Sequence, residues 1–128
     1  MTPVNRISFT LARPLPLLNV QLRTHWAKRR KAQIALAWEV VDAAQPLPEK
    51  PMTKARVTVE RYSIGTPDTD NLCVKHLLDV LCPQSKRHPV GLGVIVDDSP
   101  ACCELHVKAV KVSKRADQKT VVTVEAIA

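Results

Sequence analysis

Two short acidic stretches contain the side chains best suited to chemistry. Asp68 and Asp70 lie two residues apart in the segment TPDTDNL, and Asn71 follows directly. Asp97 and Asp98 end an apolar run further along the chain, in the segment VIVDDSP. Mg²⁺ prefers oxygen ligands, usually one or two carboxylates completed by water and phosphate oxygens. The four aspartates therefore predict a site for a hard divalent cation.

A cation at this site would do chemistry that suits the rest of the chain. Bound metal lowers the pKa of a water molecule and stabilises the charge that develops on a phosphodiester. The net charge of +7 and the isoelectric point near 9.5 favour a polyanionic partner, either nucleic acid or an acidic membrane surface. A solvated basic surface is the plain alternative. Acidic metal ligands within a basic chain are the arrangement that a nuclease needs.

The densest group of cations lies at the start of a predicted helix over residues 24–44. Thr24 is a suitable N-cap, and four apolar residues share one stripe at helical spacing: Ala27, Ile34, Trp38 and Val41. The basic group consists of Arg23, His25, Lys28, Arg29, Arg30 and Lys31. Cations near a helix N-terminus oppose the macrodipole, which favours phosphate contact over a role in helix stability. Lys86 and Arg87, in a loop over residues 82–93, are further candidate contacts.

The remaining pattern predicts a second helix and five strands. The strands are expected at residues 6–11, 56–64, 94–96, 105–112 and 120–127. The second helix is expected at about 71–81, with Asp70 or Asn71 as its cap. A polar turn predicts a hairpin between the last two strands, and a shift in apolar phase suggests a bulge near Val110. The order β-α-β-α-β-β-β predicts one α+β domain over residues 1–128, with two main helices packed on a mixed sheet.

The cysteines and the apolar runs exclude several classes of protein. The chain contains no run of 18 apolar residues, so we expect no membrane span. The N-terminus does not have the pattern of a signal peptide, so we expect an intracellular protein. Adjacent Cys102 and Cys103 do not suggest a disulfide framework. A structural zinc site remains an alternative. Its candidate ligands are Cys73 with His76, Cys103 with His106, and Cys82 with His88.

Several of these motifs together resemble a known family. They are DTDNL at residues 68–72, Lys75 followed by LLD, DDSP at 97–100, LPLLN at 15–19 and RTHWAKR at 23–29. In this order and chain length they resemble the RusA-like endodeoxyribonucleases, which are Holliday-junction resolvases found mostly in phages and prophages. The resemblance covers most of the chain.

The resemblance implies a homodimer that acts on branched DNA with Mg²⁺, for which Mn²⁺ is a substitute. It implies paired symmetric nicks that leave 5′-phosphate and 3′-hydroxyl ends, in recombination and repair. Asp68, Asp70 and Asp98 are the implied catalytic carboxylates and metal ligands, Asp97 is a further ligand, and Lys75 is the helix lysine.

The implied setting is the cytoplasm of a bacterial host, with no membrane partner and no small-molecule substrate. Three alternatives remain open. They are a nuclease with broader branched-DNA substrates, a DNA-binding protein without catalysis, and a zinc-stabilised nucleic-acid-binding domain.

Overall fold

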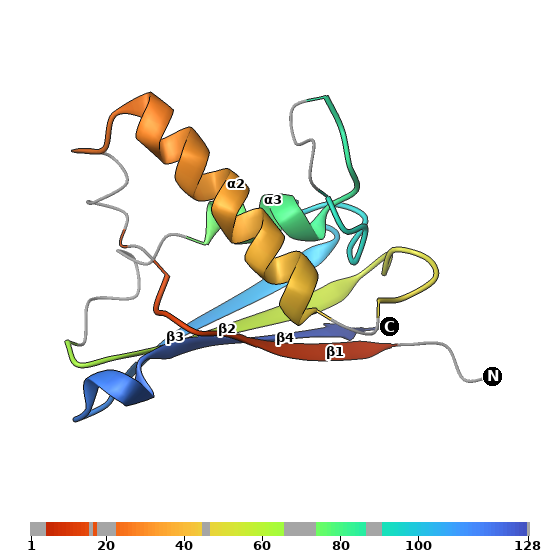
Figure 1. The fold of residues 1–128 in the computed structure, drawn as a ribbon. Coiled ribbons are helices and arrows are strands. Elements are labelled where there is room, and N and C mark those ends of the chain that lie inside the picture. The colour runs from red at the N-terminus through yellow and green to blue at the C-terminus, as the bar shows by residue number, and fades with distance from the viewer. Residues whose placement is uncertain are drawn as a thin grey trace.

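A four-stranded mixed sheet carries both main helices on one of its faces (Figure 1). The computed structural model describes residues 5–15, 17, 23–44, 47–65, 74–86 and 91–127. Its elements, in chain order, are β1 (Arg6–Leu11), α2 (Trp26–Ala43), β2 (Ala55–Ser63), α3 (Lys75–Leu81), β3 (Cys103–Lys111), the short 3₁₀ helix η2 (Arg115–Asp117) and β4 (Lys119–Ala126). The predicted α+β class, with two main helices on a mixed sheet, is confirmed.

The strands lie in the order β1-β4-β2-β3, with β2 parallel to β3 and β4 antiparallel to both of its neighbours. The predicted hairpin of the last two strands is therefore wrong, because β2 lies between them. Parallel pairing of β2 with β3 requires a crossover connection, and α3 forms part of it. The connection from β3 to β4 passes the end of β2, where Val112 N–H donates to the Ser63 carbonyl over 2.9 Å.

Two smaller expectations also change. The pairing of β2 with β3 runs without interruption from Ala55 opposite Cys103 to Ser63 opposite Lys111, so the predicted bulge is absent from this ladder. The predicted strand at 94–96 is reduced to one parallel bridge between Met52 and Ile95. The predicted order β-α-β-α-β-β-β is kept when this bridge is counted as the strand expected at 94–96.

The core lies between the sheet and the helices because alternate strand residues point to the same face. Its sheet side chains include Ile7, Phe9 and Leu11 of β1, Val57 and Val59 of β2, and Val122 and Val124 of β4. Helix α3 adds four buried residues, Leu77, Leu78, Val80 and Leu81.

Helix α2 packs through a different stripe from the predicted one. Its buried residues are Leu36, Ala37 and Val40, whereas Ile34 and Trp38 are 40% and 57% exposed. Trp38 lies about 200° around the helix from Leu36. When the side of α2 that carries Leu36 faces the core, the side that carries Trp38 therefore faces solvent. The predicted stripe was therefore wrong, since α2 carries two apolar stripes and only the one with the smaller side chains faces the core.

Both helices begin later than the sequence predicts. The N-cap of α2 is His25 rather than Thr24, and its Nδ1 accepts a hydrogen bond from the Ala27 N–H over 3.2 Å. Helix α3 begins at Lys75 with Val74 at its N-cap, and no side chain caps it. The predicted caps Asp70 and Asn71 lie outside the described residues.

The C-terminal end of α3 is capped by the backbone of residues 92–95. Leu92 N–H donates to the Val80 carbonyl over 2.8 Å, and both Val94 and Ile95 N–H donate to the Leu81 carbonyl, over 2.8 and 3.1 Å. These bonds satisfy carbonyls that a helix end leaves without an intrahelical partner. The close approach depends on Gly91, where a Cβ atom would lie 2.6 Å from the Cys82 carbonyl oxygen.

We expect Gly91→Ala to destabilise the protein by about 1–3 kcal/mol, because the added methyl group meets backbone atoms that cannot move separately. Gly65→Ala is the matched control, since a Cβ there would meet nothing within 4 Å. Thermal unfolding followed by circular dichroism measures both variants. Equal melting temperatures for the two variants would show that the 91–95 segment is not held closely against α3.

Candidate metal centre

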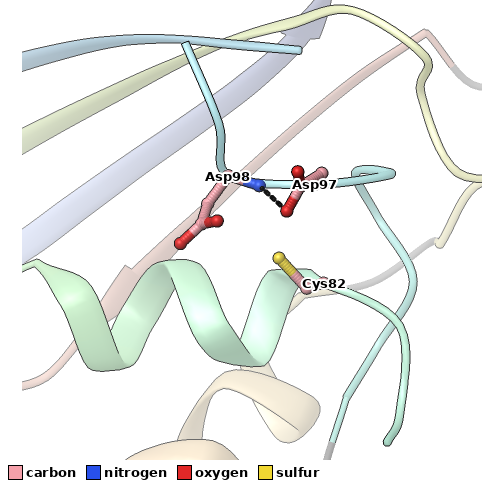
Figure 2. Close-up of side chains that lie close together, drawn as sticks. All are labelled: Cys82, Asp97 and Asp98. Atoms are coloured by element: carbon pink, nitrogen blue, oxygen red, sulfur yellow. Dashed lines mark hydrogen bonds between the residues drawn. The ribbon is translucent and has the colours of Figure 1, made fainter. Parts of the chain in front are cut away.

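Asp97, Asp98 and Cys82 form a compact group at the C-terminal end of α3 (Figure 2). One potential ligand atom from each residue lies within 4.8 Å of the other two. The Cys82 sulfur points toward the two carboxylates in Figure 2. Cys82 directly follows α3, while the aspartates come from the segment that leads into β3. Residues 15 positions apart in the sequence are therefore brought together.

The acidic pair is positioned by a buried, hydrogen-bonded anchor on its N-terminal side. Val94 and Ile95 are completely buried, and their N–H groups are the ones that cap α3. On the other side of this anchor, Met52 N–H donates to the Val94 carbonyl and Val96 N–H donates to the Met52 carbonyl, over 2.8 and 3.1 Å. The backbone immediately before Asp97 is thus fixed to both α3 and the segment that enters β2.

A tight turn fixes the C-terminal side of the pair. Asp98 N–H donates to Asp97 Oδ1 over 2.9 Å, and Cys102 N–H donates to the Ser99 carbonyl over 3.0 Å. Pro100 is the second residue of this turn, a position that its fixed φ favours. Asp97 is exposed and Asp98 is half-buried, so both carboxylates can be reached from solvent.

Cys82 contributes a neutral thiol to the group. Burial, followed by the nearby charges of Asp98 and Asp97, raises the pKa of the Cys82 thiol to about 11. The thiol is therefore protonated at neutral pH. Within the described part of the chain, no lysine, arginine or histidine forms an ion pair with Asp97 or Asp98. The two carboxylates can thus offer their charge to a cation from solution.

The donor set suits a hard cation better than a soft one. Carboxylate oxygens are the ligands of Mg²⁺, and a protonated sulfur adds little to them. Zinc sites are usually built from thiolate and imidazole ligands, and this group of described residues contains one cysteine and no histidine.

The structure opposes a zinc site at Cys103 and His106, while the further candidate ligands Cys73 and His88 lie outside the described residues. Cys103 is buried while His106, three positions later on β3, is exposed, and neighbouring positions on a strand alternate between faces. His106 Nε2 instead contacts Glu104 Oε1 at 2.6 Å.

The other predicted site residues fall into three groups. Asp68, Asp70 and Arg87 lie outside the described residues. Lys75 is exposed and begins α3, whereas Cys82 follows its last residue. Lys75 forms no ion pair with Asp97 or Asp98 in the described structure. Lys86 is exposed in the segment that follows α3.

The predicted basic group lies at the N-terminal half of α2. Arg23, His25, Lys28, Arg30 and Lys31 are exposed and Arg29 is half-buried. This half of the helix rises away from the sheet in Figure 1, and the buried residues of α2 all belong to its other half. Among the described residues, no carboxylate forms an ion pair with any of the four cations from Lys28 to Lys31.

Sequence reasoning missed two features of these sites. Cys82 had no visible connection to the acidic pair, because their contact depends on how residues 92–95 cap α3. Trp26 was not distinguished from the basic residues around it, yet it is 68% exposed. Its neighbour His25 was the only available signal, since an aromatic pair within a basic segment is typical of nucleic-acid contact.

No protein-family model matches the chain, and no curated protein matches it. Within the described residues, no helix is long and apolar enough to cross a membrane.

We expect the double variant Asp97→Asn, Asp98→Asn to increase the alkylation rate of Cys82 several-fold at pH 8.5. Removal of two negative charges lowers the thiol pKa, and the thiolate is the reacting form. Iodoacetamide labelling with peptide mass spectrometry separates Cys82 from the other cysteines. Asp117→Asn, in the distant η2 turn, is the control. Equal rates in all three proteins would show that the carboxylates do not act on this thiol.

Proposed function

We propose that this protein is a metal-dependent endodeoxyribonuclease that resolves four-way DNA junctions by paired, symmetric nicks. The observation that carries the proposal is the Asp97–Asp98 pair, anchored to a buried backbone but open to solvent, in a chain of net charge +7. A carboxylate pair without a cationic partner is repelled by a DNA backbone unless a cation lies between them. The resemblance of the sequence motifs to the RusA-like resolvases supports the same function.

The carboxylates are the groups that would hold the metal. Asp97 and Asp98 offer oxygens from one side, and we propose Asp68 and Asp70 as further ligands on the strength of their motif. Mg²⁺, or Mn²⁺ in its place, supplies charge stabilisation and an activated water when it is bound. Asp98 N–H restrains the Asp97 carboxylate by its hydrogen bond, which reduces the number of rotamers that this side chain must lose.

The cations of the chain would bind the DNA backbone. We propose that the N-terminal half of α2, with Lys86 and Arg87, neutralises phosphates of the junction arms. Lys75 lies five positions after Asp70 in the sequence, and we propose that it stabilises negative charge on the phosphate that is attacked.

The proposed reaction also implies an assembly and a setting. Opposed nicks on a junction with two-fold symmetry require two active sites, and a closed two-fold dimer of identical chains is the commonest way to supply them. We propose a homodimer that acts in recombination and repair in the cytoplasm of a bacterial host, encoded by a phage or prophage.

We expect Asp98→Asn to reduce cleavage of a labelled four-way junction at least about a hundredfold in Mg²⁺, while junction binding persists or tightens. The same result is expected for Asp68→Asn and Asp70→Asn. Gel analysis of nicked products and a binding titration in EDTA measure the two effects. Asp117→Asn, which removes an exposed carboxylate from η2, should cut normally.

Two outcomes of this experiment would change the proposal. Near-normal nicking by Asp98→Asn removes that residue from the catalytic site. Tight junction binding by the unmodified protein, with no nicking in Mg²⁺ or Mn²⁺, instead supports a DNA-binding protein without catalysis.

We expect the junction affinity to fall steeply with salt, with a slope near −0.9 in log–log form for each phosphate neutralised. The double variant Arg29→Gln, Arg30→Gln should make this slope shallower by about one to two units. Lys114→Gln, Arg115→Gln removes the same charge from the exposed turn at η2 and is the matched control. If both double variants have the slope of the unmodified protein, the start of α2 is only a solvated face.

A further inference from the structure

Trp26 is the most exposed large hydrophobic residue among those that the structure describes, at 68%. It is the first residue of α2, on the half of the helix that rises away from the sheet. Tryptophan is usually well buried, because its large ring gains more from leaving water than most side chains do. A single exposed apolar side chain is ordinary, so the groups around Trp26 must decide its role.

The surroundings of Trp26 are aromatic and cationic. The His25 ring lies beside the indole, with 5.6 Å between ring centroids and 33° between ring planes. His25 Nδ1 is also held by the Ala27 N–H, which limits rotation of this ring. The first turn of α2 contains no acidic residue, and Lys28, Arg29 and Arg30 follow at once. A ligand here must therefore tolerate strong positive charge and offer a flat apolar face.

Trp38 provides a contrast within the same helix. It is 57% exposed, but its sequence neighbour is Glu39 and Asp42 lies one turn further on. Glu39 forms an ion pair with Arg13 over 2.7 Å, so this half of α2 already carries partnered acidic charge. A polyanion is favoured at Trp26 and disfavoured at Trp38, although both indoles reach solvent.

We propose that the His25–Trp26 pair stacks against an unstacked base of DNA, while the neighbouring cations hold the phosphates on either side of that base. Aromatic side chains in a basic groove bind single-stranded nucleic acid in this way, because every base has a π face. Duplex DNA keeps its bases stacked on one another and offers no free face. The site therefore distinguishes DNA with unstacked bases, such as a branch point or a single strand, from continuous duplex.

This inference rests on the proposed function, since it assigns DNA as the ligand, but it concerns binding rather than cleavage. The start of α2 and the residues that follow the C-terminal end of α3 lie at separate places in Figure 1. Trp26 would consequently contact DNA away from Asp97 and Asp98. Its loss should weaken binding to branched DNA without removing the metal-binding carboxylates.

The chain contains two tryptophans, which makes a direct test simple. Trp38→Phe leaves Trp26 as the only indole, and Trp26→Phe leaves Trp38. Each protein is titrated in EDTA with oligothymidylate, with a four-way junction and with a matched duplex, while fluorescence anisotropy of labelled DNA reports binding. We expect the first two DNAs to quench Trp26 strongly and the duplex to quench it little, with Trp38 almost unchanged throughout.

Affinity provides the second readout. We expect Trp26→Ala to weaken binding of oligothymidylate and of the junction about tenfold, with no change for duplex and no change in salt slope. Trp38→Ala should leave all three affinities unchanged. Saturated binding without quenching of Trp26, or an equal loss of affinity for duplex and junction, would overturn the stacking site.

The outcomes also separate this inference from the proposed function. Quenching of Trp26 by single strands in a protein that never nicks DNA supports the stacking site and overturns the nuclease. Normal nicking without quenching of Trp26 fluorescence supports the nuclease and overturns the stacking site. Failure of all three DNAs to bind overturns both.

Discussion

The carbonyl groups at the end of α3 determine where the acidic pair lies. The short helix α3 ends in carbonyls without an intrahelical partner, and the segment after residue 91 supplies donors to two of them, those of Val80 and Leu81. Those donors belong to residues directly before Asp97. The hydrogen bonds that cap α3 therefore also place the carboxylates beside Cys82. The lack of a side chain at Gly91 lets this segment approach the end of α3.

The sheet supplies the second constraint, through the central strand β2. Ala55, Val57 and Val59 are buried, and β2 pairs with β3 on one side and β4 on the other. Because β2 and β3 are parallel, both strands begin at the same end of the sheet. Met52, before β2, therefore meets Ile95, before β3, and the acidic segment is held from the sheet as well as from α3.

The sequence predicts some elements well because their pattern reports burial directly. Strand β1 has the predicted bounds, since Ile7, Phe9 and Leu11 alternate between exposed residues. The stripe of α2 could not be chosen in the same way, because Ile34 with Trp38 and Leu36 with Val40 are both spaced four residues apart. The insertion of β2 between β3 and β4 is a long-range pairing, and the polar turn at 113–118 is compatible with either topology. The carboxylates were recognisable by type, whereas Cys82 depended on a contact between distant backbone segments.

Two features at the N-terminal end of α2 do not stabilise the helix, although His25 caps it. Four consecutive cations from Lys28 to Lys31 oppose the macrodipole at a cost of about 0.3–1 kcal/mol for each one near the terminus, and Trp26 remains in water. Neither feature contributes to the core, because the buried residues of α2 all lie in its other half. Both become favourable when a polyanion with flat apolar groups binds, because phosphates offset the repulsion and a base covers the indole. Nucleic acid has both properties, so a single class of ligand accounts for the charge and for the exposed ring.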